Sequence, residues 1–259
     1  MISIISDNNV DVALLSETWI SSQNNPTTAE LKSYGLKLHH CSRNSTTKDR
    51  GGGVAILCKE TFELYSCPKT IIYKSFEHVI GRIFNGTNKT NCYFLVIYRN
   101  QDVAQAIFEH DFVELLDNIF LIYKNLVIVG DFNIHYNVYS KSVEFRNIIS
   151  TFNLSQHVDF PTHEKGNTLD LIISDPAYVS VTDISTCNCD ISDHNPLFFN
   201  ISTGDNFSYI CKKVINYRKI KSIDIASFRH DLTYNRNNIV GIHEWGDIHS
   251  VSPVSHDSC

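Results

Sequence analysis

The sequence predicts an α/β sandwich, because short apolar segments typical of strands outnumber the segments with helical periodicity. The most informative strand is 126–129, Leu-Val-Ile-Val, a run of apolar residues typical of a strand buried on both faces. Two segments, 102–123 and 142–152, carry apolar residues at helical spacing and predict amphipathic helices. Mixed strands with a few long helices favour a layered α/β architecture.

Further apolar runs extend the set of predicted strands on both sides of these helices. Segment 54–57 is entered through consecutive glycines, which predict a flexible turn before it. Segment 76–84 alternates loosely between apolar and polar residues, as a half-exposed strand does. The remaining predicted strands are 10–15, 92–97, 169–173, 179–184 and 196–201.

The chain has 259 residues, enough for one large domain or two small ones. We expect one domain over 1–203, because the first clear break in the pattern is Ser-Thr-Gly-Asp-Asn at 202–206. A linker with one short helix, at 220–232, is expected over 204–233. The polar segment 234–259 is expected to form a poorly ordered tail.

The composition is that of a globular protein, with 42% hydrophobic and 19% charged residues. A net charge of -6 argues against a protein that depends on clustered Lys and Arg for non-specific phosphate attraction, but it allows an enzyme that contacts nucleic acid locally. No apolar run approaches the ~20 residues that span a bilayer, and the N-terminus lacks the pattern of a signal peptide. The eight cysteines form no Cys-x-x-Cys pair, so we expect a reduced, intracellular protein with no membrane partner.

Polar residues follow the 126–129 strand directly, in the sequence Gly130-Asp131-Phe132-Asn133. We expect Gly130 to end the strand and let the backbone turn. A carboxylate and a carboxamide at the end of a buried strand stand on a rigid base, which suits them to contact a substrate. Both residue types are also common turn formers, so this segment alone fits an ordinary turn equally well.

Other acidic residues recur near the ends of predicted strands. Glu17 follows the first strand, Asp170 lies inside an apolar segment, and Asp193 and His194 precede the last strand. Carboxylates brought together repel one another, and a divalent cation or a paired histidine relieves that cost. Mg²⁺ prefers a few carboxylates with water and phosphate oxygens, so this set favours hydrolysis of a phosphate ester. A carboxylate would deprotonate the attacking water.

In their order and spacing, these motifs resemble the endonuclease/exonuclease/phosphatase superfamily. The motifs are Glu17-Thr18-Trp19, Gly130-Asp131-Phe132-Asn133, Leu169-Asp170-Leu171-Ile172 and Ser192-Asp193-His194. A closer similarity is to the apurinic-like endonuclease domain of non-LTR retrotransposons of the jockey type, over roughly residues 8 to 232. It is carried by Arg50-Gly51-Gly52-Gly53-Val54-Ala55-Ile56, Tyr98-Arg99, Phe160-Pro161-Thr162 and Ile215-Asn216-Tyr217-Arg218.

The resemblance implies a four-layer α/β sandwich of two packed mixed sheets with outer helices, as in DNase I. It also implies a role for each acidic residue outside the His194 pair. Glu17 would be the metal carboxylate, and Asp193 would assist the metal site or a proton relay. Asp131 would orient or deprotonate the attacking water.

The remaining roles implied by the resemblance concern the phosphate. Asn133 would hydrogen-bond the scissile phosphate, and Tyr98 would contact it or stabilise its charge. His194 would bind a phosphate oxygen and would be held in place by Asp170. From the residues alone, Tyr98 is equally consistent with ordinary packing at a strand end.

The implied reaction nicks DNA with the help of Mg²⁺ or Mn²⁺ and leaves a 3′-hydroxyl and a 5′-phosphate. An enzyme active on chromosomal DNA would work in the nucleus. The family normally begins with a strand that carries an Asn near the metal, and we expect that strand to be absent here, as is a reverse transcriptase domain. The alternatives are a truncated, catalytically inactive remnant, or a phosphatase or phospholipase of the same superfamily.

Overall fold

The computed structural model describes residues 2–20, 26–42, 52–68, 71–86, 90–187 and 192–203. All of them belong to one compact unit, Met1–Phe207. Several sequence expectations lie outside the described residues: Arg50, Gly51, Ile215-Asn216-Tyr217-Arg218, the helix at 220–232, and the linker and tail over 204–259.

Every predicted strand and both predicted helices are present, with ends shifted by a few residues. The structure adds two helices, Ile2–Asp7 and Pro26–Ser33, and three strands, Leu36–Cys41, Glu63–Ser66 and Ser155–Gln156, that were not predicted. The described elements, in chain order, are α1 (Ile2–Asp7), β1 (Val12–Ser16), α2 (Pro26–Ser33), β2 (Leu36–Cys41), β3 (Val54–Lys59), β4 (Glu63–Ser66), β5 (Phe76–Asn85), β6 (Thr90–Arg99), α3 (Gln105–Ile119), β7 (Leu126–Asp131), α4 (Tyr139–Thr151), β8 (Ser155–Gln156), β9 (Asp170–Ser174), β10 (Val179–Thr186) and β11 (Leu197–Thr203).

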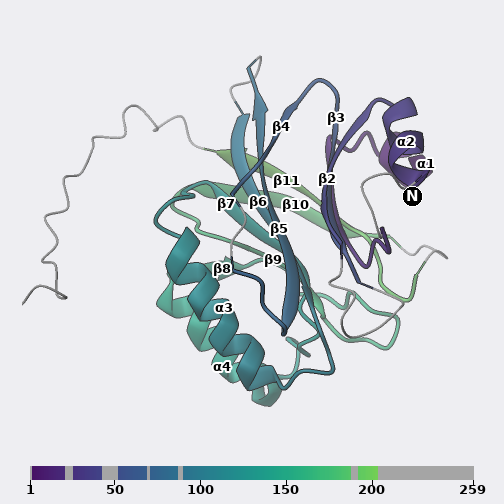
Figure 1. Cartoon of the computed structure of the whole chain (residues 1–259). Helices are drawn as coiled ribbons and strands as arrows, with labels where there is room; N and C mark the ends of the chain where they lie inside the picture. Colours follow the sequence, from purple (N-terminus) through teal and green to yellow (C-terminus); the bar gives the residue numbers. More distant parts are fainter. Residues whose placement is uncertain are drawn as a thin grey trace, which may run out of the picture. The chain divides into compact units, whose positions relative to one another are not determined.

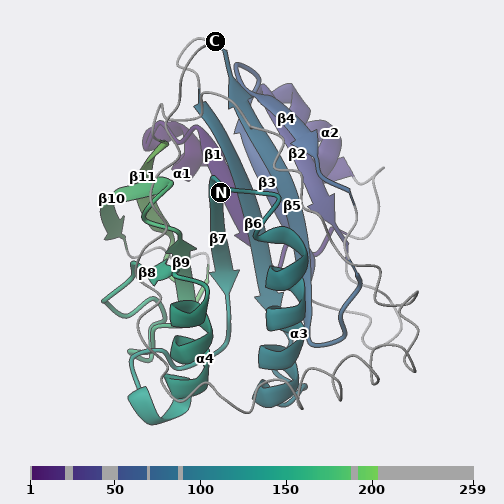
Figure 2. The same ribbon diagram turned by 90° about the vertical axis from the view of Figure 1, so that its left-hand side faces the viewer.

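The strands form a mixed six-stranded sheet and two smaller sheets. The six-stranded sheet has the order β4-β5-β6-β7-β9-β8, and only its β6–β7 pair is parallel. The smaller sheets have the orders β1-β3-β2 and β10-β11. Helices α3 and α4 lie together on one face of the six-stranded sheet in both views (Figure 1 and Figure 2). The layered α/β architecture expected from the sequence is therefore confirmed.

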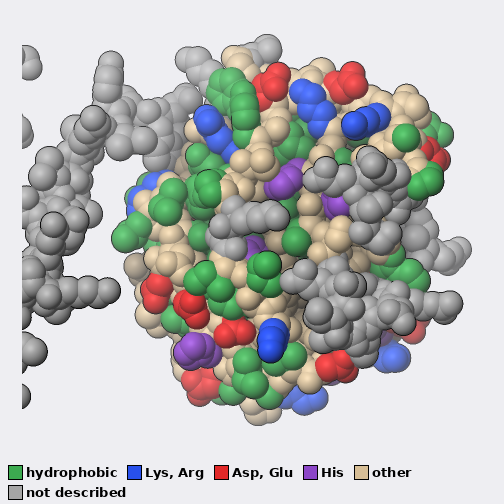
Figure 3. Space-filling model, in the orientation of Figure 1, with side chains coloured by type: hydrophobic (Ala, Val, Ile, Leu, Met, Phe, Trp, Pro, Cys, Tyr) green, Lys and Arg blue, Asp and Glu red, His purple; other side chains and the backbone are tan. Residues whose placement is uncertain are grey.

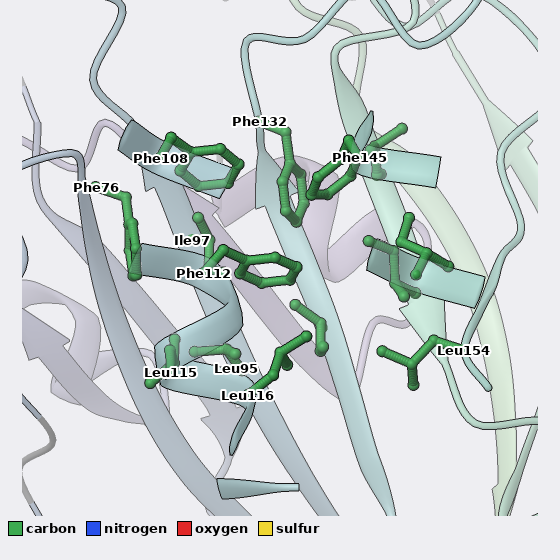
Figure 4. Close-up of a cluster of buried hydrophobic side chains, with 14 of the residues drawn as sticks. Phe76, Leu95, Ile97, Phe108, Phe112, Leu115, Leu116, Phe132, Phe145 and Leu154 are labelled. Carbon is green, nitrogen blue, oxygen red and sulfur yellow. The ribbon is translucent and has the colours of Figure 1, made fainter. Parts of the chain in front are cut away.

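Two apolar cores hold these layers together on opposite faces of the six-stranded sheet. The core under α3 and α4 is rich in phenylalanine, including Phe108, Phe112 and Phe145 (Figure 4). The other core lies on the face turned toward β3 and contains Val54, Val96, Val127 and Val129. A third, smaller cluster packs Ile5 of α1 and Leu31 of α2 against Leu57 of β3. The structure therefore has four layers. Helices α1 and α2 pack on the β1-β3-β2 sheet, the two small sheets pack on the large sheet, and α3 and α4 cover the other face of the large sheet.

Strand β7 contributes to both large cores, as its sequence predicted. Leu126 and Ile128 belong to the core under the helices, while Val127 and Val129 belong to the core between the sheets. The prediction for Gly130 was wrong, because the strand continues through this residue to Asp131. Gly130 has φ 140°, and a Cβ there would lie 1.9 Å from the carbonyl oxygen of Ile97 on β6. Glycine is needed for this close approach of two strands and not for a turn.

The distribution of charged side chains and the burial of two cysteines fit the expectations from the composition. On the described part of the face in Figure 3, acidic and basic side chains are interspersed, without one dominant basic patch. Cys58 and Cys92 are buried, and burial raises the pKa of Cys92 to about 12, so this thiol packs as a small apolar group. Among the described residues, no helix is long and apolar enough to cross a membrane.

Candidate active site

Four adjacent strands of the large sheet each place one polar side chain in a single row. The strand registers pair Glu77 with Tyr98, Tyr98 with Asp131, and Asp131 with Asp170. Side chains of directly paired residues lie on the same face of a sheet. The row therefore crosses β5, β6, β7 and β9 on the face that carries Val129, toward the smaller sheets. This register explains how residues far apart in the sequence come together.

His194 extends the row at its Asp170 end. Its Nδ1–H donates a hydrogen bond to Oδ2 of Asp170 across 2.7 Å. Burial lowers the pKa of His194, but this bond and the negative charges of Asp170, Asp131 and Asp193 outweigh burial and raise the pKa to about 9. At neutral pH the ring is a cation, and its Nε2–H is the donor that can meet an anionic oxygen.

Asp131 is the most buried acid of the row, with 5% of its surface exposed. Burial raises its pKa to about 7, and the charge of Asp170 adds to this rise, while the positive charge of His194 opposes it. A carboxylate that titrates near neutral pH can take a proton from water and release it again. Within one site, Asp131 can therefore exchange a proton near neutral pH, while His194 keeps its proton.

Asn133 holds the Asp131 carboxylate in place. Its backbone N–H donates to Oδ1 of Asp131 at 2.9 Å, and its Nδ2 donates to Oδ2 at 3.1 Å. The second Nδ2 hydrogen goes to the carbonyl oxygen of Arg99, and Gln101 donates to the Asn133 Oδ1. Asn133 adopts φ 49°, a left-handed conformation that asparagine tolerates. Both amide hydrogens are engaged here, so the expected phosphate contact of Asn133 stays a prediction.

Glu17 reaches the row from the end of β1, in the smaller sheet. It accepts a hydrogen bond from the Tyr98 hydroxyl, so the structure brings these two predicted site residues together. Glu17 has φ 53°, and the next two residues donate their backbone N–H groups to the carbonyl oxygens of Gly53 and Gly52. The Gly53 N–H in turn donates to Glu77 at 2.5 Å. The glycines expected to form a simple turn therefore also anchor the Glu17 segment to the large sheet.

Asp193 lies beside His163, a residue that the sequence reasoning missed. His163 Nε2 is 3.2 Å from Oδ2 of Asp193, and its ring packs edge-on against His194 with centroids 4.8 Å apart. His163 Nδ1 accepts the Lys165 N–H at 3.0 Å, so Nε2 carries the proton that faces Asp193. The available signal was its position directly after Phe160-Pro161-Thr162, a segment already singled out.

Thr162 explains why that segment matters. Its hydroxyl oxygen accepts the backbone N–H groups of Leu169 and Asp170, both at 3.0 Å, and its side chain is fully buried. The bond fixes the start of β9, where Asp170 stands. Thr162 is thus a support for the Asp170–His194 pair.

Three groups of described side chains bring potential metal ligands within 4.8 Å of one another, and two of them lie at this site: Asp131 with Asp170 and His194, and His163 with Asp193 and His194. Protonated His194 has no lone pair to offer a metal, so carboxylate oxygens dominate the donors that remain at the row. Oxygen donors suit a hard cation such as Mg²⁺ or Mn²⁺. Glu17 belongs to neither of these groups of potential ligands, and Asp193 belongs only to the second. The two carboxylates predicted to bind the metal therefore do not occur together in either group of described side chains.

Comparison with known proteins identifies the family and the fold. The model of the Endonuclease/Exonuclease/phosphatase family matches residues 1–194. No curated protein sequence matches the chain. Similar solved structures include the endonuclease domain of TRAS1, a telomere-specific non-LTR retrotransposon, with TM-score 0.59 and 14% identity over 77% of this chain and 88% of that one.

Two further solved structures are similar in fold. The human Nocturnin catalytic domain has TM-score 0.59 and 16% identity, covering 78% of this chain and 84% of that one. The 3′ phosphatase NExo from Neisseria, bound to a product DNA hairpin, has TM-score 0.55 and 15% identity, covering 77% and 92%. Identities this low establish the fold alone. The family model, which matches most of the chain, shows that this protein belongs to the endonuclease/exonuclease/phosphatase family.

Proposed function

We propose that the chain is a divalent-metal-dependent endonuclease that nicks DNA, leaving a 3′-hydroxyl and a 5′-phosphate. The observation that carries the proposal is the placement of Asp131 beside the hydrogen-bonded pair of Asp170 and His194. One carboxylate that titrates near neutral pH and one histidine that stays protonated form a proton acceptor and a proton donor in a single site.

Hydrolysis of a phosphodiester needs a deprotonated water and stabilisation of the charge on the phosphate oxygens. Asp131 would accept the proton from the attacking water, because its pKa of about 7 lies close to neutral pH. The His194 Nε2–H would donate to a non-bridging phosphate oxygen, with the ring held in one orientation by Asp170. Asn133 would keep both oxygens of Asp131 aimed at the water.

The other predicted site residues complete the phosphate and cation contacts. Tyr98 would offer its hydroxyl near the phosphate, next to its present partner Glu17. Glu17 and Asp193 would supply carboxylate oxygens for Mg²⁺ or Mn²⁺. When bound, this cation would offset the negative charge of the carboxylates and of the phosphate.

DNA is the substrate that the comparisons favour. The TRAS1 domain, similar in fold, is described as an endonuclease of a non-LTR retrotransposon, and the closer resemblance noted in the sequence is to the same class of element. The 3′ phosphatase NExo, which has a similar fold, was solved with a DNA product. The same proposal implies that the enzyme acts on chromosomal DNA in the nucleus.

The test is conversion of supercoiled plasmid to the nicked circle by the full chain, with Mg²⁺ or with EDTA. We expect nicking with Mg²⁺ alone, and a loss of at least about a hundredfold in Asp131→Asn and His194→Gln. Asp117→Asn and His110→Gln, on the exposed surface of α3, are matched controls that should nick at the unmodified rate.

A folded protein that leaves plasmid intact with Mg²⁺ or Mn²⁺ would contradict the proposal and favour an inactive remnant. Release of phosphate from soluble monoesters without plasmid nicking would favour a phosphatase instead. Circular dichroism of each variant separates loss of the site from loss of the fold.

A further inference from the structure

Trp19 is a large aromatic residue that stands exposed beside the polar row. Its exposed fraction is 62%, whereas the next residue, Ile20, is buried with 6% exposed. Glu17, whose carboxylate accepts the hydrogen of the Tyr98 hydroxyl, lies two residues before it. Two residues of chain span at most about 7 Å. The Trp19 backbone therefore lies within about two steps of a DNA strand, of 3.4 Å each, from that of Glu17.

The backbone at Trp19 is fixed in an unfavourable conformation. Trp19 has φ 57°, in the left-handed region that a bulky residue rarely adopts. Its N–H donates to the carbonyl oxygen of Gly52 at 2.9 Å, and the Thr18 N–H donates to that of Gly53 at 3.1 Å. A Cβ on Gly53 would lie 2.6 Å from Oγ1 of Thr18, so the two segments are in close contact. These contacts hold the backbone from which the indole projects.

Ordinary packing does not explain a tryptophan held in this way. Because the residue is mostly exposed, little burial of apolar surface offsets the strain of its backbone. Aromatic residues at the centre of protein interfaces have apolar neighbours, but on one side of Trp19 in the sequence stand the half-buried Thr18 and the exposed Glu17. Strained residues of this kind are concentrated at functional sites, where a ligand gives them their use.

We infer that the indole of Trp19 stacks on one unpaired nucleobase of the DNA, next to the scissile phosphate. This inference rests on DNA as the proposed substrate. Every base has a π-face, so stacking on an aromatic side chain strengthens binding without a requirement for a particular sequence. A base inside a duplex is already stacked and paired, and an unpaired base reaches the indole at a lower cost. DNA with an unpaired nucleotide close to the cut is therefore the preferred substrate.

The charge of the chain favours stacking as a source of affinity. The net charge is -6, and on the described part of the face in Figure 3 no basic patch dominates. Attraction of phosphates requires Lys and Arg side chains and weakens with salt. Stacking on a neutral indole requires a base instead of a charge. It therefore predicts a preference for a nucleotide with a base over an abasic nucleotide at the same place.

The test compares two hairpin DNAs of the same sequence, bound to the full chain in EDTA so that no hydrolysis is needed. One hairpin carries a single unpaired thymidine, and the other carries an abasic nucleotide at that place. We expect the thymidine hairpin to bind about tenfold more tightly. The ratio of the two affinities should change little with salt, because both hairpins carry the same phosphates.

Tryptophan fluorescence reports on the contact directly. Trp19 and Trp245 are the two tryptophans of the sequence, so in the Trp245→Phe variant the emission comes from Trp19 alone. The thymidine hairpin should quench this emission at saturation, and the abasic hairpin should quench it much less. Equal quenching by the two hairpins would contradict a contact between the indole and the unpaired base.

Substitutions at Trp19 separate stacking from simple apolar contact. Trp19→Phe keeps an aromatic face and should retain the thymidine preference within about threefold, whereas Trp19→Leu keeps only apolar bulk and should bind the two hairpins equally. Tyr34→Ala removes another exposed aromatic side chain, between α2 and β2, and is the matched control that keeps the full preference. With Mg²⁺, Trp19→Leu should raise KM for the thymidine hairpin about tenfold and change kcat by less than about threefold.

Several outcomes would overturn the inference. Equal binding of the two hairpins by the unmodified chain would exclude stacking, and tighter binding of the abasic hairpin would mean that the site takes a sugar without its base. A full thymidine preference in Trp19→Leu, folded by circular dichroism, would assign the contact to another residue.

The inference and the proposed function fail in different ways. A chain that nicks plasmid but shows no thymidine preference keeps the proposed function and loses the stacking site. Quenching of Trp19 by the thymidine hairpin, without nicking in Mg²⁺ or Mn²⁺, keeps the stacking site and contradicts the nuclease.

Discussion

His194 and Asp170, 24 residues apart in the sequence, are joined by a hydrogen bond of 2.7 Å at the end of the polar row. This bond fixes the orientation and the charge of the His194 ring, and Asp170 also affects Asp131. It uses Nδ1 of the ring, keeps the ring charged at neutral pH, and leaves Nε2 for a substrate oxygen. The negative charge of Asp170 also raises the pKa of its neighbour Asp131. A single aspartate thus keeps one neighbour protonated and makes the other a better proton acceptor.

Asp170→Asn should lower both activity and the pKa of His194. The substitution removes the charge that keeps the ring protonated, so the pKa should fall from about 9 toward its ordinary value of 6.5. NMR titration of the His194 ring checks the shift, and plasmid nicking should fall about a hundredfold at neutral pH. An unchanged titration would show that Asp170 does not set the charge of His194.

Asp131→Asn should make the protein more stable while it abolishes nicking. Burial and the charge of Asp170 raise the Asp131 pKa to about 7, so the ionised form destabilises the fold above that pH. A neutral side chain of the same shape removes that cost, but its NH₂ group faces one of the two Asn133 donors and loses that hydrogen bond. The loss offsets part of the gain, so we expect a net gain of about 1 kcal/mol in the free energy of unfolding. Urea denaturation in EDTA above pH 7 measures it. Asp117→Asn on the exposed face of α3 is the matched control and should change stability by less than about 0.5 kcal/mol.

The metal-free protein should lose stability as the pH rises from about 6.5 to 9. His194 has a raised pKa in the folded state, so the stability it contributes is complete below 6.5 and disappears as the ring loses its proton near pH 9. With a quarter of its side chain exposed, we expect a loss of roughly 2 kcal/mol from this group. Denaturation at a series of pH values shows the slope, which His194→Gln should flatten. A slope that persists in the variant would assign it to another group.

The sequence predicted most of the strands because burial leaves a direct mark on residue type. Strand β7 is the clearest case, since Leu126 and Ile128 face one core and Val127 and Val129 the other. Strand β2 was missed because Leu-Lys-Leu-His-His-Cys contains polar residues that are only partly buried. Helices α1 and α2 are short and bury few side chains, so their periodicity is weak.

Within the site, the sequence predicted which residues take part better than it predicted which of them contact one another. Asp131, Asp170 and His194 carry a sequence signal, but the row that joins them comes from strand register, which the sequence does not state. The same holds for Glu77, whose contact with Gly53 depends on two sheets meeting. Gly130 was read as a turn because the sequence gives no sign of a neighbouring strand at that distance.

His163 should act through Asp193, and two substitutions separate its ion-pair contact with Asp193 from its hydrogen bond with the Lys165 N–H. His163→Gln can place an N–H near the position of Nε2 and so keep the contact with Asp193. His163→Asn keeps an acceptor for the Lys165 N–H but is too short to reach Asp193. Both lose the ring that packs on His194. We expect nicking within about threefold of normal for the glutamine variant and about tenfold lower for the asparagine variant. Equal losses in nicking would mean that packing of the His163 ring on His194, and not the contact with Asp193, supports the activity.

Gly130→Ala should unfold the site, and Gly166→Ala provides the matched control. A Cβ at Gly130 would lie 1.9 Å from the Ile97 carbonyl oxygen, so β6 and β7 would have to separate. We expect a loss of about 3 kcal/mol or more, together with loss of nicking, because Asp131 is the next residue. Gly166 also has a positive φ, of 78°, but an added Cβ there meets nothing within 4 Å. Its alanine variant should lose only about 1 kcal/mol, from backbone strain alone. Chemical denaturation compares the two, and equal losses would mean that strain, rather than close approach of the strands, requires glycine at position 130.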